Sequence, residues 1–339
     1  MKAMVLEQPN QMALQTIDEP RPEKGQVLIR TTHAGICGTD TKIYQGKIPA
    51  SYPLVMGHEI VGEIVGGDTA EFARPGTRVL VDPVLYCGTC YHCSQQDTHL
   101  CPNGGIMGRE ANGGFADYCV AQNTHIYPLP QEINGTTGAA IQVLTTVLHA
   151  QDKGEVGVGD TVVVSGLGVT GLMHIQLAKA RGAKVVIGVS RNAHKREVAM
   201  SLGADMAVAH GEEAQKYVLD ATDGVGADIV IECVGYLALL GEAVALARPG
   251  GKIIPFAIYP SGQAELPFYD FYFKELEIVN VRAARGRDFN ECIELVSKNK
   301  VDLGALITHT LPYTELNDAI RMLMEPSDER IKVILEGVC

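Results

Sequence analysis

The sequence predicts an α/β protein of two domains: a doubly wound parallel sheet with helices on both faces, and a domain rich in short strands. Its 339 residues suffice for about two domains at roughly 150 residues each. From about Gly159 to Val281, strand-like apolar runs alternate with helical segments, which is typical of parallel sheets covered by helices. Before that stretch, proline and glycine interrupt short apolar runs, as in irregular strand-rich domains.

The apolar periods define the expected elements of the alternating stretch. We expect strands at residues 161–165, 184–189, 206–209, 227–232 and 252–256, and helices at 169–181, 193–202, 212–221 and 237–247. Earlier runs at 27–29, 60–65 and 78–81 predict strands, and a helix is expected near 290–297. Because the texture becomes mixed again after Val281, we expect the tail to return to the first domain. The expected boundaries are 1–145, with a lobe at 86–102, then 146–281 and 282–339.

Composition and charge exclude several classes of protein. Hydrophobic residues make up 46% and charged residues 20% of the chain, as in a globular protein rather than a disordered one. The net charge of −12, without a basic cluster, makes nucleic acid an unexpected partner. The most apolar stretch, 229–247, is interrupted by glycine and glutamate, so we expect no membrane span. Glu7 comes too early for a signal peptide. We therefore expect a cytoplasmic protein whose nine cysteines are not disulfide-bonded.

A glycine-rich turn follows the first strand of the alternating stretch. It has the G-x-G-x-x-G pattern and opens a helix: Gly166, Leu167, Gly168, Val169, Thr170 and Gly171. In such turns the glycines permit a tight bend, close approach to a pyrophosphate and close helix–strand packing. The helix N-terminus then faces the anion. The alternative is a turn that binds nothing, but the strand–helix context favours a dinucleotide site on a Rossmann domain.

The end of the second strand bears on the choice of dinucleotide. An acidic residue roughly 20 positions after the glycines normally binds the ribose diol of NAD. This chain has Ser190 and Arg191 there, with Lys195 and Arg196 one turn later. A guanidinium can pair with a 2′-phosphate through two hydrogen bonds, so we expect NADP, with NAD as the alternative. Arg191 could instead simply begin a solvated helix.

A polar, turn-rich segment carries four closely spaced cysteines: Cys87, Cys90, Cys93 and Cys101. Four thiolates can close a tetrahedral shell around zinc and leave no open position. Such a site stabilises a lobe but performs no chemistry. An iron–sulfur cluster is the alternative. We expect His92 and His99, which lie among these cysteines, to be solvated loop residues.

A catalytic metal site needs fewer protein ligands and an open position. Its candidates are Cys37, which follows Gly35-Ile36, and His58 with Glu59, which follow Gly57. Taken alone, Cys37 could be a buried thiol and His58 a core histidine. Flanking glycines let two ligand-bearing loops approach one ion, which favours a metal site.

Together these motifs resemble those of the zinc-containing medium-chain alcohol and polyol dehydrogenases. The resemblance runs essentially end to end and implies a GroES-like catalytic domain, a partly open β-barrel holding both metals, joined to a Rossmann domain. It also implies a dimer or tetramer. The strings that carry it, besides the four cysteines and the glycine turn, are Cys37-Gly38-Thr39-Asp40, Gly57-His58-Glu59 and Gly113-Gly114-Phe115-Ala116-Asp117-Tyr118.

The resemblance implies roles for residues near the catalytic metal. Cys37 and His58 match ligands of the catalytic zinc. Glu59 matches a neighbouring carboxylate, which in relatives either ligates the metal or exchanges with water. Thr39 matches the hydroxyl that receives the proton of the substrate alcohol.

Two positions depart from the family pattern. The third protein ligand, which is Cys, Asp or Glu in different branches, falls on Gln142; its neutral amide is a weak ligand, so Glu59 or water is the alternative. The histidine that often ends the proton relay falls on Lys42. An ammonium with a pKa near 10.4 accepts a proton at neutral pH only if burial lowers that pKa.

The implied reaction transfers hydride between an alcohol carbon and NADP or NAD, with zinc as Lewis acid. Thr146 resembles the residue that packs beside the nicotinamide, and Val234 is a further candidate contact. We expect one catalytic and one structural Zn²⁺, a small alcohol or carbonyl substrate, and a homo-oligomer. Polyols, sugars, amino alcohols and secondary alcohols suit this chemistry. The alternatives on the same fold, a zinc-independent quinone reductase and a non-catalytic relative, typically lack the ligands kept here.

Overall fold

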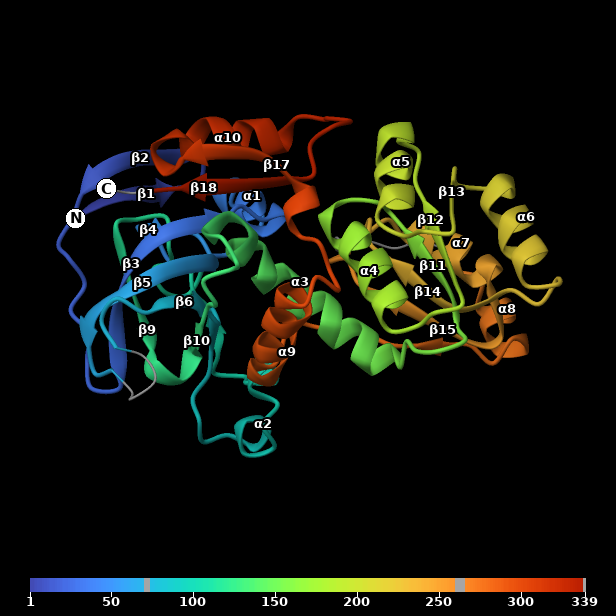
Figure 1. Cartoon of the computed structure of the whole chain (residues 1–339), viewed down its shortest axis with the longest axis horizontal. Coiled ribbons are helices and arrows are strands. Elements are labelled where there is room, and N and C mark those ends of the chain that lie inside the picture. The colour runs from blue at the N-terminus through green and yellow to red at the C-terminus, as the bar shows by residue number, and fades with distance from the viewer. Residues whose placement is uncertain (70–73, 260–265, 338–339) are drawn as a thin grey trace. The chain divides into compact units, whose positions relative to one another are not determined.

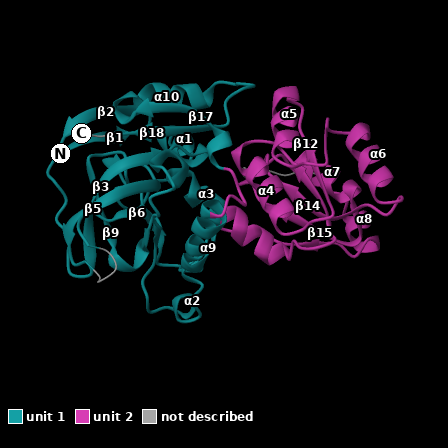
Figure 2. Cartoon of the chain, viewed as in Figure 1, with its two compact units in different colours: residues 1–145, 284–297, 303–339 teal, residues 146–283, 298–302 magenta. Residues whose placement is uncertain are grey.

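The computed structural model describes residues 1–69, 74–259 and 266–337. The chain forms two compact units (Figure 2). Unit 1 contains Met1–Thr145, Ala284–Ser297 and Leu303–Cys339, and unit 2 contains Thr146–Ala283 and Lys298–Asp302. The long helix α3 (Gly135–Gly154) belongs to both, because the division falls inside it.

Unit 1 is built mainly of antiparallel strands (Figure 1). Its largest sheet has the order β10-β6-β5-β3-β18-β17, and β9 also pairs with β3. The bounds are β3 Gln26–Gly35, β5 Glu59–Gly67, β6 Arg78–Val81, β9 Tyr118–Gln122, β10 Ile126–Pro128, β17 Ile307–Pro312 and β18 Lys332–Glu336. The expected strands at 27–29 and 60–65 are the apolar parts of β3 and β5. Both strands continue through polar residues, because the backbone ladder between them runs from Val27–Gly67 to Gly35–Glu59.

The remaining elements of unit 1 are short. A second sheet has the order β2-β1-β4, and β7 pairs with β8. Their bounds are β1 Lys2–Gln8, β2 Gln11–Thr16, β4 Leu54–Val55, β7 Val84–Leu85 and β8 Gly105–Ile106. The helices are α1 Gly38–Tyr44, α2 Tyr91–Ser94, α9 Gly286–Ser297 and α10 Leu316–Met324. The helix expected near 290–297 is the last eight residues of α9.

Unit 2 contains the doubly wound sheet that the sequence predicts. Its six strands are all parallel and have the order β13-β12-β11-β14-β15-β16. The strands are β11 Thr161–Ser165, β12 Val185–Val189, β13 Met206–Val208, β14 Ala227–Glu232, β15 Ala247–Pro255 and β16 Glu277–Ile278. The helices are α4 Val169–Ala180, α5 Ala193–Ser201, α6 Glu212–Ala221, α7 Leu237–Leu246 and α8 Phe268–Phe273. The chain order reverses at β11, and ligands of such sheets bind at the carboxyl ends of the strands beside this point.

The sequence pattern did not predict strand β16 or helix α8, and two further details differ from it. Strand β15 begins at Ala247 rather than near residue 252, because Ala247 already pairs with Ala227. Residues 248–251 then form an irregularity before Lys252 pairs with Ile229. Residues 298–302 cluster with unit 2. The side chain of Gln176 on α4 bonds the backbone of Asp302 twice, at 3.0 and 2.6 Å.

None of the helices in the described part of the chain combines the length and apolar character that a bilayer crossing requires.

Candidate functional site

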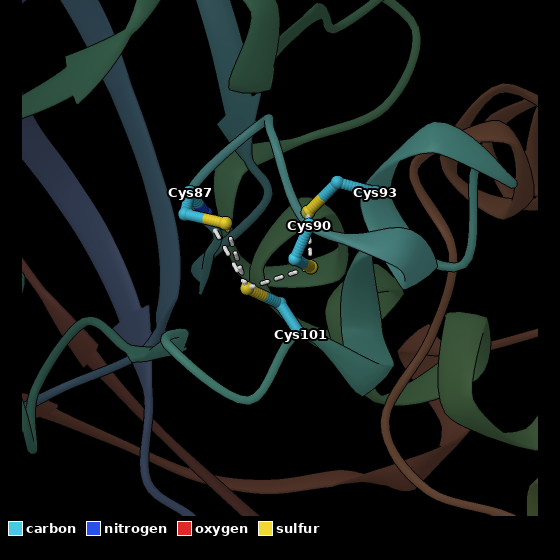
Figure 3. A group of neighbouring side chains, drawn as sticks. All are labelled: Cys87, Cys90, Cys93 and Cys101. Carbon is cyan, nitrogen blue, oxygen red and sulfur yellow. Dashed lines mark hydrogen bonds between the residues drawn. The ribbon is translucent and has the colours of Figure 1, made fainter.

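The four cysteines of the lobe face one another (Figure 3). The sulfur atoms of Cys90 and Cys93 are 3.5 Å apart, those of Cys90 and Cys101 3.8 Å, and those of Cys87 and Cys101 3.5 Å. A tetrahedron of thiolates about 2.3 Å from zinc has sulfur–sulfur edges of about 3.8 Å. The four residues therefore fit one zinc ion in a closed shell.

The local chain explains this arrangement and its electrostatics. Cys90 caps α2 and Cys93 lies within it, while Cys101 follows a short 3₁₀ turn at Thr98–Leu100. Hydrogen bonds from the backbone and side chain of Thr89 lower the pKa of Cys87 to about 5. Burial, followed by hydrogen bonding with Cys90, raises the pKa of Cys93 to about 12. Adjacent thiolates repel one another, so full deprotonation of this shell requires a cation.

The sequence led us to expect that both histidines of the lobe are solvated. The structure shows that only one of them is accessible to solvent. His92 on α2 is half-buried, and His99 is buried at 7% exposure. The expectation was wrong for His99 because the 3₁₀ turn directs its side chain inward. Neither histidine belongs to the four-sulfur group.

A second group joins Cys37, His58 and Glu59, whose ligand atoms all lie within 4.8 Å of one another. Cys37 caps α1 immediately after β3, and Glu59 opens β5 opposite Gly35 of β3. A Cβ at Gly35 would lie 1.8 Å from Glu59 Oε2. A glycine is therefore required for the glutamate to lie across the neighbouring strand.

Asp40, which the sequence analysis treated only as part of a motif, orients two members of this group. Its Oδ2 accepts a hydrogen bond of 2.8 Å from the backbone N–H of Cys37, and its Oδ1 lies 3.4 Å from His58 Nδ1. Burial by itself lowers the pKa of His58. The charge of Asp40, and interactions of the imidazole with the side chains of Asp40 and Cys37, outweigh this effect and raise the pKa well above its ordinary value. A carboxylate on one ring nitrogen leaves the other nitrogen for a metal.

Lys332 was missed by the sequence analysis. It begins β18, is only 2% exposed, and donates hydrogen bonds to Ile36 O at 3.0 Å and to Glu59 Oε2. The other carboxylate oxygen, Glu59 Oε1, is buried and has no hydrogen-bond partner in the structure. Lys332 thus holds one oxygen of Glu59 and leaves the other for the metal group. The available signal was a lysine opening the apolar run Val333-Ile334-Leu335.

The other predicted residues of this region lie on two helices. Thr39 is half-buried in the first turn of α1, next to Cys37, and Lys42 is half-buried in its last turn. Gln142 is buried on α3, where its backbone carbonyl accepts a hydrogen bond of 2.6 Å from the Thr145 hydroxyl.

The glycine turn of unit 2 has the geometry of a phosphate-binding loop. Gly166 has φ +96°, a conformation that favours glycine, and Gly168 caps α4. A Cβ at Gly168 would meet nothing within 4 Å, so this side of the turn is open to a ligand. A Cβ at Gly171 would lie 1.9 Å from Gly166 O. The third glycine therefore lets the helix begin against the turn. Val169 and Thr170 lie in the first turn of α4.

The predicted 2′-phosphate residues follow β12. Ser190 is buried, Arg191 is exposed and Lys195 is half-buried in α5. Arg196, which the sequence places beside Lys195, donates hydrogen bonds to Ser190 O at 2.7 Å and Arg191 O at 3.1 Å. Its guanidinium therefore packs over the backbone of this segment.

Two predicted contacts of the nicotinamide lie elsewhere in unit 2. Thr146 is half-buried on α3. Val234 is 38% exposed, and its Cγ2 lies 2.5 Å from where a Cβ on Gly166 would be. Val234 thus lies directly beside the glycine turn.

Comparison with known proteins agrees with these sites. Two family models match: the alcohol dehydrogenase GroES-like domain over residues 23–131 and the zinc-binding dehydrogenase over residues 169–298. A sorbitol dehydrogenase of Halalkalibacterium halodurans is 32% identical and covers 100% of each chain. Among solved structures, a zinc-binding dehydrogenase of Sinorhizobium meliloti 1021 bound to NADP has a TM-score of 0.93 at 29% identity, covering 99% of each chain. The alcohol dehydrogenase rspB of Escherichia coli CFT073, complexed with NADH, has a TM-score of 0.92 at 32% identity and the same coverage.

The chain therefore belongs to the family of zinc-containing medium-chain alcohol and polyol dehydrogenases. The resemblance and the fold class predicted from the motifs are confirmed. The protein is an enzyme, a zinc dehydrogenase of alcohols or polyols that depends on a nicotinamide dinucleotide.

Proposed function

We propose that the enzyme oxidises a polyol or another secondary alcohol with NADP, or reduces the corresponding carbonyl compound. The observation that carries this proposal is the group of Cys37, His58 and Glu59, which offers three ligand types at one point rather than a closed shell. A polyhydroxy substrate is suggested by the similarity to a sorbitol dehydrogenase. The lobe cysteines would hold a second, structural zinc.

The residues at and around this group are assigned the following roles in the proposal. Cys37 and His58 would hold the catalytic zinc, and the free Oε1 of Glu59, the amide of Gln142 or water would complete its shell. The ion supplies Lewis acidity toward an alcohol oxygen when it is bound. Thr39, beside Cys37, would accept the proton of the substrate hydroxyl and pass it outward, with Lys42 one turn further along α1.

The preference for NADP is supported by the segment after β12. It presents Ser190, Arg191 and Lys195 in place of a carboxylate, and the guanidinium of Arg196 lies over the same backbone. Relatives bind either dinucleotide in solved structures, so the charge of this segment is the argument for NADP. Thr146 and Val234 would contact the nicotinamide half.

Removing a ligand of the catalytic zinc tests the proposal. We expect Cys37→Ala or His58→Ala to abolish oxidation of a panel of polyols, sugars and secondary alcohols, and to reduce zinc from about two to about one per chain. NADPH binding, followed by nucleotide fluorescence, should be nearly unchanged because the glycine turn lies in the other unit. Cys119→Ala is the control, because Cys119 is a buried thiol that belongs to neither of the two metal-ligand groups. Full turnover by Cys37→Ala would overturn the assignment.

Two further expectations accompany this function. Reduced thiols that serve as metal ligands fit the cytoplasm. Helix α8 exposes four aromatic side chains, at 64% to 77% of their surface: Phe268, Tyr269, Tyr272 and Phe273. Exposed apolar patches of this kind mark protein interfaces, and we propose that a second copy of the chain covers this one in a dimer or tetramer.

A further inference from the structure

A buried carboxylate at the end of β14 organises the segment that follows it. Glu232 is fully buried. Its Oε1 accepts hydrogen bonds from the backbone N–H groups of Val234 at 2.8 Å and Gly235 at 3.1 Å. Its Oε2 accepts a bond of 3.0 Å from Gly235 N–H and another from the hydroxyl of Tyr259. A buried charge is tolerated only when it is well hydrogen-bonded, and here two backbone amides and a phenol serve that purpose.

This carboxylate connects segments that follow neighbouring strands. The hydroxyl of Tyr259 reaches Glu232 from the segment after β15, and Phe256 N–H donates a bond of 2.9 Å to Glu232 O. On the other side, Cys233 N–H donates a bond of 2.8 Å to Ser165 O at the end of β11. The segments after β11, β14 and β15 are thus joined at one edge of the sheet.

This connection lies where one half of a bound dinucleotide would extend. The sheet order places β12 on one side of β11, and β14 and β15 on the other. A dinucleotide with its pyrophosphate at the glycine turn and its adenosine ribose at Ser190, beyond β12, must extend its other half over β14 and β15. Exposed apolar side chains lie there: Val234 at 38% and Ile258 at 66% exposure. An apolar surface suits the faces of a planar nicotinamide ring.

We propose that Glu232 and Tyr259 are positioning residues for the nicotinamide half of the bound dinucleotide. Glu232 fixes the backbone that carries Val234, and Tyr259 holds the carboxylate in place from the segment that carries Ile258. This role rests on the proposed binding of a dinucleotide at the glycine turn, and it requires no contact between either residue and the cofactor.

The phenol remains a hydrogen-bond donor throughout the working pH range. Burial, followed by a hydrogen bond to Glu232, raises the pKa of Tyr259 above its ordinary value. Replacing Tyr259 by phenylalanine keeps the ring and removes only this donor. It is therefore a smaller disturbance than any change at Glu232, and the main test uses it.

The test compares a whole dinucleotide with one of its halves. Hydrogen bonds to charged groups are worth about 1.5–3 kcal/mol, or roughly 10- to 150-fold. Part of the free energy of the Tyr259–Glu232 hydrogen bond should contribute to NADPH affinity, because the bond fixes the segment beneath the nicotinamide half. We therefore expect Tyr259→Phe to weaken NADPH binding about 5- to 20-fold. Binding of adenosine 2′,5′-bisphosphate, which lacks the nicotinamide half, should change less than twofold. Glu232→Gln should act in the same direction. Tyr217→Phe, at a partly exposed tyrosine of α6, is the control, with both affinities measured by calorimetry.

The outcomes separate this inference from the proposed function. If wild-type protein binds NADPH and Tyr259→Phe binds it equally well, the positioning role is wrong and the dehydrogenase assignment stands. Equal losses for NADPH and the bisphosphate would show a general effect on unit 2, which also overturns the role. If wild-type protein binds neither NADPH nor NADH, the proposed function fails first. A Glu232→Gln protein that does not fold leaves the comparison at Tyr259 intact.

Discussion

Lys332 and Glu59 place opposite charges where neither reaches water, at 2% and 0% exposure. Removing one partner of such a pair leaves an uncompensated charge, whereas removing both can be nearly neutral. The pair also links the two chain segments that carry Cys37 and His58, because the lysine bonds Ile36 O as well as the glutamate. Its geometry therefore affects both folding and the metal group.

A double-mutant cycle tests this pair. We expect Lys332→Met to lower the free energy of unfolding by about 3–5 kcal/mol, as measured by urea denaturation of metal-free protein. Adding Glu59→Gln should recover most of that loss, since no buried charge remains. Lys332→Arg, which keeps the charge, is the matched control. A single Lys332→Met variant as stable as wild type would contradict the interpretation.

At the same scale, the residues after β12 are the proposed determinants of cofactor choice. We expect NADP to exceed NAD in kcat/KM. Ser190→Asp combined with Arg191→Ala should reverse the order, because a carboxylate binds the ribose diol and repels a 2′-phosphate. A charge-assisted contact is worth about 1.5–3 kcal/mol, and its loss should appear in KM because the contact is remote from the hydride. Arg287→Ala, at an exposed arginine of unit 1, should leave the ratio unchanged. A wild-type preference for NAD would remove the NADP assignment alone.

Among the elements, the cysteine lobe has only short helical turns of its own. Structural zinc contributes directly to folding free energy in such segments. We expect Cys93→Ser to lose one zinc per chain and to lower Tm by on the order of 10 °C, since several kcal/mol are lost at a few degrees each. Zinc analysis and a thermal scan check this, with Ser94→Ala as the neighbouring control. Unchanged zinc content would contradict it.

We expect a buried histidine of helix α4 to make the protein sensitive to acid. His174 is fully buried, and burial, followed by the charge of Arg181, lowers its pKa to about 3. An unfolded chain takes up this proton near pH 6.5, whereas the folded chain resists it. The stability from this site is present above pH 6.5 and is lost as pH falls toward 3, by up to about 1.4 kcal/mol per pH unit.

Replacing that histidine should therefore flatten the pH profile. We expect His174→Gln to lose less Tm than wild type between pH 7.5 and pH 5, even if it is less stable at pH 7.5. His194→Gln, at an exposed histidine of α5, should follow the wild-type profile. Parallel profiles for His174→Gln and wild type would show that His174 does not cause the sensitivity.

At the scale of the whole molecule, the aromatic surface of α8 is the proposed interface between copies of the chain. Tyr269 and Phe273 lie with ring centroids 4.3 Å apart and are mostly exposed. We expect Tyr269→Glu with Phe273→Glu to reduce the assembly to smaller species in size-exclusion chromatography with light scattering. Charges desolvated in an interface oppose association. Tyr217→Glu on α6 is the control, and an unchanged mass for the double variant would exclude α8 from the interface.

The sequence predicted five of the six strands of the parallel sheet, because each of these five contains an apolar run. It did not predict β16, which is the exposed pair Glu277–Ile278. Strand β14 and helix α6 have the bounds that the periodicity indicates. Strands β3 and β5 extend beyond their apolar runs, because their polar residues are paired through the backbone. Strand β15 begins earlier than its apolar run, because Ala247 pairs with Ala227 ahead of an irregularity at residues 248–251. The inward turn of His99 is likewise absent from any pattern of residue types.

The sequence by itself determined the family, the parallel-sheet unit and the grouping of metal-ligand residue types, because local periods and short spacings carry that information. Only the tertiary structure decided which distant residues support them. Lys332 reaches Glu59 across 273 positions of sequence, and Tyr259 reaches Glu232 across 27. The first contact arises because β5 and β18 both pair with β3, and the second because β14 pairs with β15. A side chain's partner is then determined by the pairing of strands, which no local pattern specifies.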